Sequence, residues 1–351
     1  MRVALDATPL LGRRTGIGQY AAQLLAALAK GDDELVATAF TFRGRGGLEV
    51  PRGVQVTARP APARLLQEAW ARLDWPPVEL LSGSCDIFHA TNFVLPPLAR
   101  ARGVVTIHDL AYLHLTGTVR AASARYRALV PRSVRRASVI ITPSEAVATQ
   151  VREAYDPDVP VVPVPHGVDP AWATAEPATS SLRAQLGLPT SYIVFVGTLE
   201  PRKDVATLLA AHRLTPHAPP LVLVGPAGWG ERVDVTGCVT PGYLDGPALR
   251  SVVAGAAALM LPSLDEGFGL PVLEALAAGV PVVASDLPVL REVGGEVVRY
   301  APAGDAEGFA AALSGVLSFP PATDALRAQA DGFTWARSAA GHRAAYRLAL
   351  R

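Results

Sequence analysis

Short apolar runs that alternate with amphipathic stretches constrain the fold of this chain more than any other feature. The runs are Val3–Leu5, Gly103–Ile107, Val139–Thr142, Tyr192–Val196, Leu221–Val224, Ala258–Leu261 and Val280–Ala284. Strands of a parallel sheet that are buried on both faces have this composition. Helical patterns lie between them, at Tyr20–Lys30, Ser144–Tyr155, Val205–His212 and Gly246–Ala257. The alternation predicts the α/β class with doubly wound sheets.

The length of the chain favours two domains. A chain of 351 residues is long for a single hydrophobic core. Residues 156–189 are rich in Pro, Ala, Thr and Ser, as expected where a chain leaves one domain and enters another. We therefore place the domain boundary near Asp169.

Composition excludes several classes of protein. Half of the residues are hydrophobic, 18% are charged and the net charge is +1, which argues against a disordered chain and against a nucleic-acid binder. Cys85 and Cys238 lie far apart without a Cys-x-x-Cys pair, which argues against a disulfide framework and a structural zinc site. The strand-like start at Arg2–Asp6 has no signal-like apolar region, and no later run is long enough to span a membrane. We expect a cytoplasmic protein.

The stretch from Pro262 to Gly279 is the strongest candidate for a functional site. Pro271 suits the first turn of a helix, and Gly279 provides a stop. Gly267 and Gly269 leave the first N–H groups of this helix uncovered, so a phosphate could lie against the positive end of the helix dipole. The pattern predicts an anion site at a helix N-terminus.

Two glutamates flank this predicted anion site. Glu266 precedes the helix and Glu274 lies one turn inside it. Acidic residues are common near helix N-termini for purely structural reasons. Here both carboxylates could accept hydrogen bonds from hydroxyl groups on either side of a diphosphate. A nucleotide sugar has hydroxyls at both ends and a diphosphate between them, so it is the ligand that this pattern favours.

The spacing of the glutamates resembles the Glu-x7-Glu signature of retaining glycosyltransferases of the GT4 family, which have the GT-B fold. The resemblance implies two Rossmann-like domains that face each other across a cleft. It implies an acceptor-side domain at 1–168, a nucleotide-sugar-binding domain at 169–332, and a final helix at 333–351 that crosses back to the first domain. It further implies that Glu266 faces the donor sugar and that Glu274 binds the ribose.

A basic pair follows the strand at Tyr192–Val196. Arg202 and Lys203 lie in the segment that begins at Gly197, at the carboxyl end of a predicted parallel strand, where ligands bind in this fold class. They could be a solvated pair on a loop. The negative charge of a diphosphate must be balanced by positive groups. The planar guanidinium of an Arg and the ammonium of a Lys can balance it without a metal ion. The family resemblance implies this role, so we expect no metal and no cofactor.

His108 follows the predicted strand Gly103–Ile107 in the first domain. An isolated His is often a satisfied structural residue. The resemblance implies that His108 lies near the anomeric carbon, where it orients the sugar and stabilises the transition state electrostatically. It also implies a front-face transfer, in which the leaving phosphate accepts the proton of the acceptor, so His108 is not expected to be a general base.

Other segments carry weaker signals. Thr15–Gly18 lies between the first strand and a helix expected to begin near Gln19. A Gly-x-Gly motif at this place is a weak signal for a phosphate-binding loop, because a tight turn without a ligand can have the same sequence. Gly225 and Tyr243 follow strand ends that resemble segments beside the nucleobase. The donor-binding candidates are Gly16, Gly18, Gly197, Gly225, Tyr243, Gly267, Phe268, Gly269, Leu270 and Glu274.

Six arginines gather between Arg120 and Arg136 without an acidic residue. They could attract anionic lipid headgroups or a polyprenyl-diphosphate acceptor. A solvated helix face explains them equally well. Peripheral contact with the inner face of the membrane therefore stays open.

The leading hypothesis is a retaining, metal-independent glycosyltransferase. The sequence of Thr198–Lys203 resembles the corresponding segment of family members that use GDP-mannose, although members that use UDP-sugars share most of it. The acceptor would be the hydroxyl of a glycan, a lipid-linked molecule or a small molecule. Alternatives are a nucleotide-sugar epimerase, a phosphorylase, and a nucleotide-sugar binding protein without catalysis. The phosphorylase is disfavoured because Lys203 is already assigned to the diphosphate.

Overall fold

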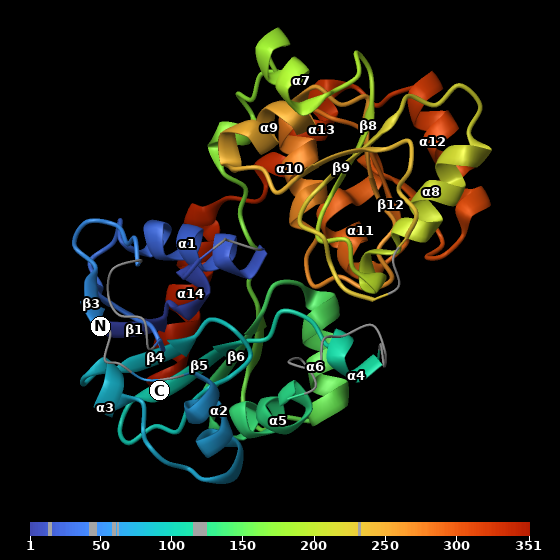
Figure 1. Ribbon diagram of the computed structural model, residues 1–351. Coiled ribbons are helices and arrows are strands. Elements are labelled where there is room, and N and C mark those ends of the chain that lie inside the picture. Colours follow the sequence, from blue (N-terminus) through green and yellow to red (C-terminus); the bar gives the residue numbers. More distant parts are fainter. Residues whose placement is uncertain (13–15, 42–47, 58–60, 62, 115–124, 231–232) are drawn as a thin grey trace. The chain divides into compact units, whose positions relative to one another are not determined.

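The structure is a computed structural model that describes residues 1–12, 16–41, 48–57, 61, 63–114, 125–230 and 233–351 (Figure 1). The described residues divide into two compact units. The first unit contains residues 1–114, 125–167 and 334–351, and the second contains residues 168–333. Each unit is built on its own parallel sheet.

In its described part, the first unit has a seven-stranded sheet in which all neighbouring strands are parallel. The strand order is β3 (Gln55–Thr57), β2 (Glu34–Thr38), β1 (Arg2–Asp6), β4 (Ile87–Ala90), β5 (Arg102–Thr106), β6 (Val139–Thr142) and β7 (Val161–Pro163). The central strands are rich in Val, Ile and Leu because helices cover both faces of the sheet. Chain order runs outward in both directions from β1 and β4, which makes their junction a topological switch point.

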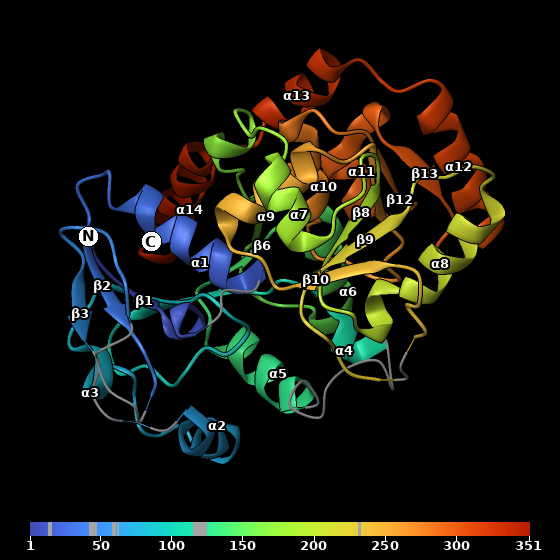
Figure 2. The same cartoon turned by 45° about the horizontal axis from the view of Figure 1, so that its top comes forward.

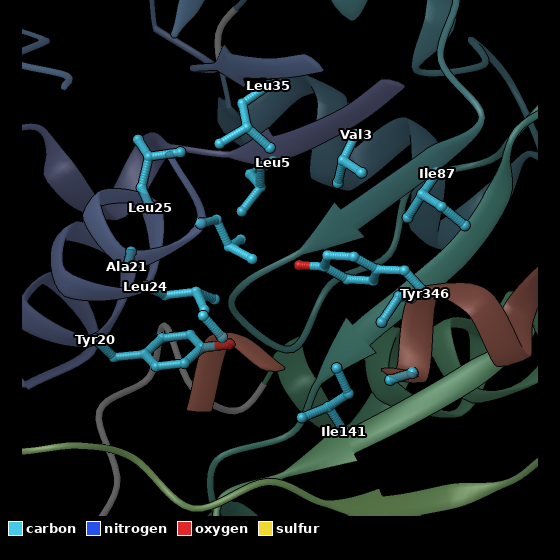
Figure 3. Close-up of a cluster of buried hydrophobic side chains, with 14 of the residues drawn as sticks. Val3, Leu5, Tyr20, Ala21, Leu24, Leu25, Leu35, Ile87, Ile141 and Tyr346 are labelled. Carbon is cyan, nitrogen blue, oxygen red and sulfur yellow. The ribbon is translucent and has the colours of Figure 1, made fainter. Parts of the chain in front are cut away.

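Helices α1 (Gly16–Leu28) and α14 (Trp335–Ala349) pack together on the sheet of the first unit. Figure 3 shows Tyr346 of α14 and Tyr20 and Leu24 of α1 converging on side chains from the strands. The C-terminal helix therefore completes the core of the first unit. The other helices among the described residues of this unit are η1 (Thr8–Leu10), α2 (Ala63–Arg72), α3 (Glu79–Ser82), α4 (Ala111–His114), α5 (Tyr126–Arg136) and α6 (Glu145–Tyr155).

A buried chain of hydrogen bonds ties α14 to the sheet. The Nδ1 of His342 lies 2.8 Å from the carbonyl of Ser338, which can only accept, so Nδ1 carries the proton. The Nε2 of neutral His342 then accepts from the hydroxyl of Tyr20 at 2.9 Å. Because Tyr20 has one proton to donate, its oxygen must accept from the hydroxyl of Thr106, also at 2.9 Å.

The same reasoning fixes the next two bonds. The hydroxyl of Thr106 has donated its proton, so it accepts from Nε2 of His89 at 2.8 Å. The Nδ1 of His89 therefore accepts from the hydroxyl of Tyr346 at 2.9 Å. When both histidines are neutral, each of the five bonds in this chain has one donor and one acceptor. The network thus links β4, β5, α1 and α14 and is consistent with the uncharged form of both rings, which burial favours.

In its described part, the second unit has a six-stranded parallel sheet. The order is β10 (Val239–Gly242), β9 (Leu221–Val224), β8 (Ile193–Val196), β11 (Ala258–Leu261), β12 (Val282–Ser285) and β13 (Arg299–Ala301). The direction of the chain order reverses between β8 and β11. The loops that leave these two strands therefore emerge side by side, at the position where ligands bind in doubly wound sheets.

Helices cover both faces of this sheet, because right-handed crossovers in opposite directions lie on opposite faces. Helices α8 (Val205–Leu214) and α12 (Ala306–Ser318) pack together on one face (Figure 2). The other face carries α9 (Gly246–Ala254), α10 (Leu270–Ala278), α11 (Pro288–Gly294) and α13 (Thr323–Asp331). Short elements of this unit are η3 (Pro170–Trp172), α7 (Ser180–Leu186), η4 (Pro201–Lys203) and η5 (Gly295–Val297).

The α/β class and the pair of doubly wound sheets are confirmed, and all of the strands expected from apolar runs are present. One local expectation is wrong. Helix α1 begins at Gly16 and not near Gln19, so Gly16 and Gly18 lie in its first turn instead of in a preceding loop. Thr15, which begins that motif, lies outside the described residues. Within the described ranges, no helix has the length and apolar character needed to cross a membrane.

Candidate donor-binding site

The loops that follow β8 and β11 meet at the switch point of the second unit. The loop after β8 ends in η4, which carries Arg202 and Lys203, and the loop after β11 carries Glu266. The backbone N–H of Leu264 donates to the carbonyl of Arg202 at 2.8 Å, which joins the two loops. Two segments more than sixty positions apart in the sequence thus form one site.

Glu266 lies between two cations. Its Oε1 is 2.5 Å from Nζ of Lys203, and its Oε2 is 3.4 Å from Arg202. The hydroxyl of Ser263 also donates to Oε1, at 2.7 Å. Glu266 and Lys203 are both buried. A buried carboxylate needs such pairing because desolvation of an isolated charge is costly.

Electrostatics keep Glu266 ionised. Burial acts to raise the pKa of its carboxyl group, but the charges of Lys203 and Arg202 and the hydrogen bonds from Lys203 and Ser263 outweigh burial and hold the pKa below its usual range. Burial lowers the pKa of Lys203, and the charge of Glu266 opposes that shift. The ammonium of Lys203 has three N–H donors, and the bond to Glu266 uses one.

Arg202 is oriented by two further partners that the sequence reasoning did not assign. Its guanidinium donates to the carboxylate of Glu200 at 3.0–3.1 Å and to the carbonyl of Asp265 at 2.8 Å. Glu200 and Ser263 are thus part of the site. The sequence shows Glu200 two positions before Arg202, and this short spacing of opposite charges indicates a pair. No local pattern marks Ser263.

The start of α10 has the geometry that its sequence predicts. Gly269 adopts a left-handed conformation, with φ of 91°, and Pro271 lies in the first turn. Gly279 ends the helix, also with a positive φ, of 77°. The ring of Phe268 is buried and packs edge-on against Phe333, with the ring centroids 6.0 Å apart. A donor contact at Phe268 would therefore use its backbone.

Glu274 differs electrostatically from Glu266. Burial raises the pKa of its carboxyl group to about 8, and the negative charge of Asp169 adds to this shift while Arg250 opposes it. Asp169 itself caps η3, because its carboxylate accepts from the N–H of Ala171 at 2.9 Å. The two glutamates of the motif thus have opposite pKa shifts.

Backbone hydrogen bonds hold the ends of β8, β9 and β10 close together. The N–H of Gly197 donates to Val224, and the N–H of Gly225 donates to Gly242, each at 2.9 Å. A Cβ at Gly225 would lie 1.9 Å from the carbonyl oxygen of Gly197, so a glycine is required there. Tyr243 follows β10 with 40% of its surface exposed. Packing alone therefore accounts for Gly225, whereas Tyr243 is accessible.

The remaining candidates lie in the first unit. The Nε2 of His108 donates to the carbonyl of Thr91 at 2.8 Å, so Nδ1 carries a lone pair when the ring is neutral. Burial lowers the pKa of His108, which favours that neutral form. Tyr20 and His166 pack against the ring, with centroids at 5.0 and 5.9 Å. Gly18 is buried in α1, and Gly16 is exposed.

The arginine-rich segment is partly structural. Arg127 and Arg132 donate to backbone carbonyls, and Arg136 donates to two carbonyls and pairs with Asp74. Arg125 and Arg135 are exposed. Arg120 lies outside the described residues.

No cluster of three or more His, Cys, Asp or Glu side chains with metal-binding geometry is found in the part of the chain that the structure describes. The charged groups that converge in the second unit are Arg202, Lys203, Glu200 and Glu266.

Comparison with known proteins identifies the family. Residues 14–172 match the family described as Glycosyltransferase Family 4, and residues 190–318 match Glycosyl transferases group 1. The O-antigen chain mannosyltransferase B of Escherichia coli is 30% identical, over 77% of this chain and 74% of that protein. The O-antigen chain mannosyltransferase RfbU of Salmonella typhimurium is 24% identical, over 88% of this chain and 89% of that protein.

Solved structures agree on the fold. Sucrose-phosphate synthase from Thermosynechococcus elongatus has a TM-score of 0.79 at 21% identity and covers 99% of this chain and 98% of its own. Alr3699/HepE from Anabaena, in complex with UDP-glucose, has a TM-score of 0.70 at 19% identity, with 97% and 98% coverage. Together with the two Rossmann-like sheets, these matches show that the chain is a GT-B glycosyltransferase and belongs to glycosyltransferase family 4.

Proposed function

We propose that the protein transfers a sugar, with retention of anomeric configuration, from a nucleotide diphosphate donor to an acceptor hydroxyl. The observation that carries this proposal is the convergence of Lys203, Arg202 and Glu266 at the switch point of the second unit, beside the N-terminus of α10. Cations and a helix N-terminus are what a diphosphate requires. Glu274, within α10, then binds the ribose, and Glu266 faces the sugar.

The proposed transfer is a front-face displacement. The bond between the anomeric carbon and the phosphate oxygen breaks, and its electron pair leaves with the diphosphate. The acceptor oxygen bonds to the anomeric carbon on the same face, and its proton passes to the departing phosphate oxygen. Arg202 and Lys203 stabilise the charge that grows on the diphosphate, and neutral His108 orients the sugar. This route needs no general base and no metal ion.

Mannose from GDP-mannose is the donor that we propose first. The two O-antigen relatives are named as mannosyltransferases. The HepE structure contains UDP-glucose, which makes UDP-sugars the matched alternative. A nucleotide-sugar epimerase and a non-catalytic binding protein are the competing functions. The epimerase would isomerise the sugar without an acceptor, and the binding protein would leave the donor intact.

A donor panel tests the proposal. Purified protein is mixed with GDP-mannose, UDP-glucose and UDP-N-acetylglucosamine, and thermal shift and donor hydrolysis are measured for each. We expect GDP-mannose to produce the largest shift and slow release of GDP, and NMR of the first-formed sugar to show the anomer of the donor. Release of the opposite anomer, or isomerisation of the sugar on the nucleotide, would reject retaining transfer.

We predict that a chelator leaves donor turnover unchanged, because Arg202 and Lys203 supply the positive charge for the diphosphate. The measurement is the rate of GDP release before and after dialysis against EDTA, with added Mg²⁺ and Mn²⁺ as the comparison. Loss of turnover with EDTA and recovery with either cation would contradict the prediction.

Nucleotide affinity should rise with pH, because Glu274 must lose its proton before it can accept hydrogen bonds from ribose hydroxyls. With a pKa of about 8 in the free protein, proton release accompanies binding. Linkage then gives an increase of about tenfold in GDP affinity between about pH 7 and about pH 9. Burial is the main cause of this raised pKa, and two charged groups modify it: Asp169 before η3 raises it further, and Arg250 in α9 lowers it.

Calorimetry with bare GDP measures this dependence. The matched variant Glu274→Gln has no proton to release, so its affinity should be lower by roughly ten- to hundredfold at about pH 9 and nearly constant with pH. Glu266→Gln should retain the pH dependence. An affinity that falls with pH in the unaltered protein would show that Glu274 does not bind the nucleotide as a carboxylate.

Contact with anionic lipid headgroups is a further proposal for the arginine-rich segment. Arg125, Arg127 and Arg135 are the exposed members among its described residues. Arg127 donates to backbone carbonyls, so Arg125 and Arg135 would make the lipid contact. Sedimentation with vesicles that contain phosphatidylglycerol should deplete the protein from solution. The Arg125→Glu, Arg135→Glu double variant should remain in the supernatant.

A further inference from the structure

Polar residues collect at a second switch point, in the first unit. Strands β1, β4 and β5 are neighbours in the sheet, and the chain order reverses between β1 and β4. Asp6 ends β1, Asn92 follows β4, and His108 and Asp109 follow β5. Parallel strands direct their carboxyl ends to one edge of a sheet, so these residues share a position at which doubly wound sheets bind ligands.

Hydrogen bonds join these strand ends directly. The hydroxyl of Thr91 donates to the carbonyl of Asp6 at 2.6 Å, and His108 donates to the carbonyl of Thr91 at 2.8 Å. The side chain of Asn92 hydrogen-bonds with the phenol of Tyr126, but the Oδ1 of Asn92 is buried without a hydrogen-bond partner. An unsatisfied buried acceptor costs about 1–3 kcal/mol, and a ligand hydroxyl would satisfy it.

The backbone at this edge is also strained. Phe93 is buried and has a φ of 57°, in the left-handed region that non-glycine residues seldom occupy. The N–H of Val94 donates to the carbonyl of Asn92 at 2.6 Å across this turn. The ring of Phe93 stacks on Tyr126, with centroids 4.7 Å apart. Such strain persists where surrounding contacts enforce it and is concentrated at ligand sites.

The groups at this edge predominantly accept hydrogen bonds. Asp6 and Asp109 present carboxylates, Asn92 presents its unpartnered Oδ1, and neutral His108 carries a lone pair on Nδ1. Asp6 is 9% exposed, and burial raises the pKa of its carboxyl group to about 6, so its charge at neutral pH costs stability. An array of this kind suits a ligand rich in O–H donors, whereas the two carboxylates repel a phosphate.

We infer that Asp6, Asn92, Asp109 and Tyr126, the acceptor cluster, bind the acceptor substrate through the hydroxyls of an uncharged carbohydrate. This inference rests on the proposed transfer reaction, since only that reaction requires an acceptor. It narrows the substrate class: the end of the acceptor that reaches β1, β4 and β5 is a neutral sugar or polyol, and any phosphate or diphosphate group lies elsewhere on the acceptor.

Direct binding tests the inference without a donor. Saturation-transfer NMR is recorded with methyl α-D-mannopyranoside, methyl α-D-glucopyranoside and myo-inositol as neutral probes, and with mannose 6-phosphate as the anionic probe. We expect at least one neutral probe to bind more tightly than mannose 6-phosphate. Asn92→Ala and Asp6→Asn should each weaken that binding by about tenfold, the loss typical of one hydrogen bond to a charged or buried partner.

The Asp6→Asn variant separates binding from folding. Asparagine keeps an oxygen that can accept from the N–H of Thr8, as Asp6 does at 2.9 Å, and removes the buried charge. Its thermal midpoint should therefore rise by a few degrees at neutral pH while sugar binding weakens. A purely structural Asp6 would show a lower midpoint and unchanged sugar binding. The exposed Asp32→Asn is the control and should alter neither quantity.

The outcomes distinguish this inference from the proposed function. If the unaltered protein hydrolyses a donor but binds no neutral probe, or binds mannose 6-phosphate most tightly, the inference fails and the proposed transfer stands. Unchanged sugar binding in both variants would also overturn it. If no donor is hydrolysed, the proposed transfer fails, whatever the sugar-binding result.

Discussion

Replacement of Lys203 by alanine should lower kcat on a proven donor by roughly 10²–10³, the loss seen when one preorganised oxyanion donor is removed. Lys203 would act mainly on the charge that develops as the sugar–phosphate bond breaks, so the loss should appear in kcat more than in donor affinity. Arg202→Ala should have a similar effect on kcat. Arg202→Lys should recover only part of it, because an ammonium lacks the planar fork of a guanidinium.

The structure also predicts that Lys203→Ala lowers the free energy of unfolding more than Arg202→Ala does. Lys203→Ala leaves the buried carboxylate of Glu266 with Arg202 at 3.4 Å as its remaining cation. Breaking a buried pair in this way costs about 3–5 kcal/mol, and the residual contact places the expected loss near the lower figure. Arg202 is more exposed, with 20% of its side chain accessible, so its removal should destabilise the protein less.

A double variant separates turnover from folding. Lys203→Met combined with Glu266→Gln removes both charges and nearly conserves volume, so stability in urea unfolding should recover while kcat stays low. Arg213→Ala, on the exposed end of α8, is the matched control and should change neither quantity. Near-normal kcat in both the Lys203→Ala and Arg202→Ala variants would remove the leaving-group stabiliser from the proposed mechanism.

Acidification should destabilise the first unit strongly, because four histidines are buried there: His89, His108, His166 and His342. Burial lowers the pKa of each ring, and that of His342 falls to about 4. With His89 and His342 neutral, every bond of the hydrogen-bond chain has a donor and an acceptor. The unfolded chain, by contrast, binds protons near pH 6.5.

The sign follows from linkage. A histidine with a depressed folded pKa contributes stability that is complete above about pH 6.5 and is lost as pH falls toward the folded pKa. For His342 the loss amounts to about 3 kcal/mol by pH 4. Asp6, whose pKa is raised to about 6, acts oppositely, since its protonation below that pH removes the cost of a buried charge. Protonation of Asp6 therefore adds about 3 kcal/mol to the free energy of unfolding. This gain offsets the loss caused by one buried histidine but not the losses caused by four.

Urea unfolding at a series of pH values between about 7 and about 5 measures this effect. His342→Phe should be less stable than the unaltered protein at neutral pH, by about 1–3 kcal/mol, because Tyr20 loses its acceptor. The difference should shrink on acidification, since phenylalanine cannot take up a proton. Exposed His114→Gln is the control. A constant difference across this range would show that His342 is protonated in the folded protein.

Local signals explain the parts of the fold that the sequence predicts well. Apolar runs such as Leu221–Val224 become strands buried on both faces, and Pro271 and Gly279 bound α10 as expected. The apolar runs do not predict β2, β3, β7, β10 and β13. They are edge strands or lie next to an edge, and Pro163 and Pro241 interrupt the pattern in two of them.

Strand β4 was missed for a different reason. His89 interrupts its apolar run, and a buried histidine is tolerated only because Tyr346 and Thr106 satisfy its two nitrogens. Tyr346 is 257 positions away in the sequence. A prediction from the residues that surround His89 in the sequence therefore contains no information about that partner.

By itself the sequence determined the α/β class, the bounds of most central elements and the candidate residues Glu266, Arg202 and Lys203, because each depends on periodicity or on nearby residues. Only the tertiary structure decided that Lys203 pairs with Glu266, that the carboxyl groups of Glu266 and Glu274 have opposite pKa shifts, and that Asp6 and Asn92 share an edge with His108. Strand order sets these contacts. Which strands become neighbours depends on burial summed over the whole sheet, and no local pattern encodes it.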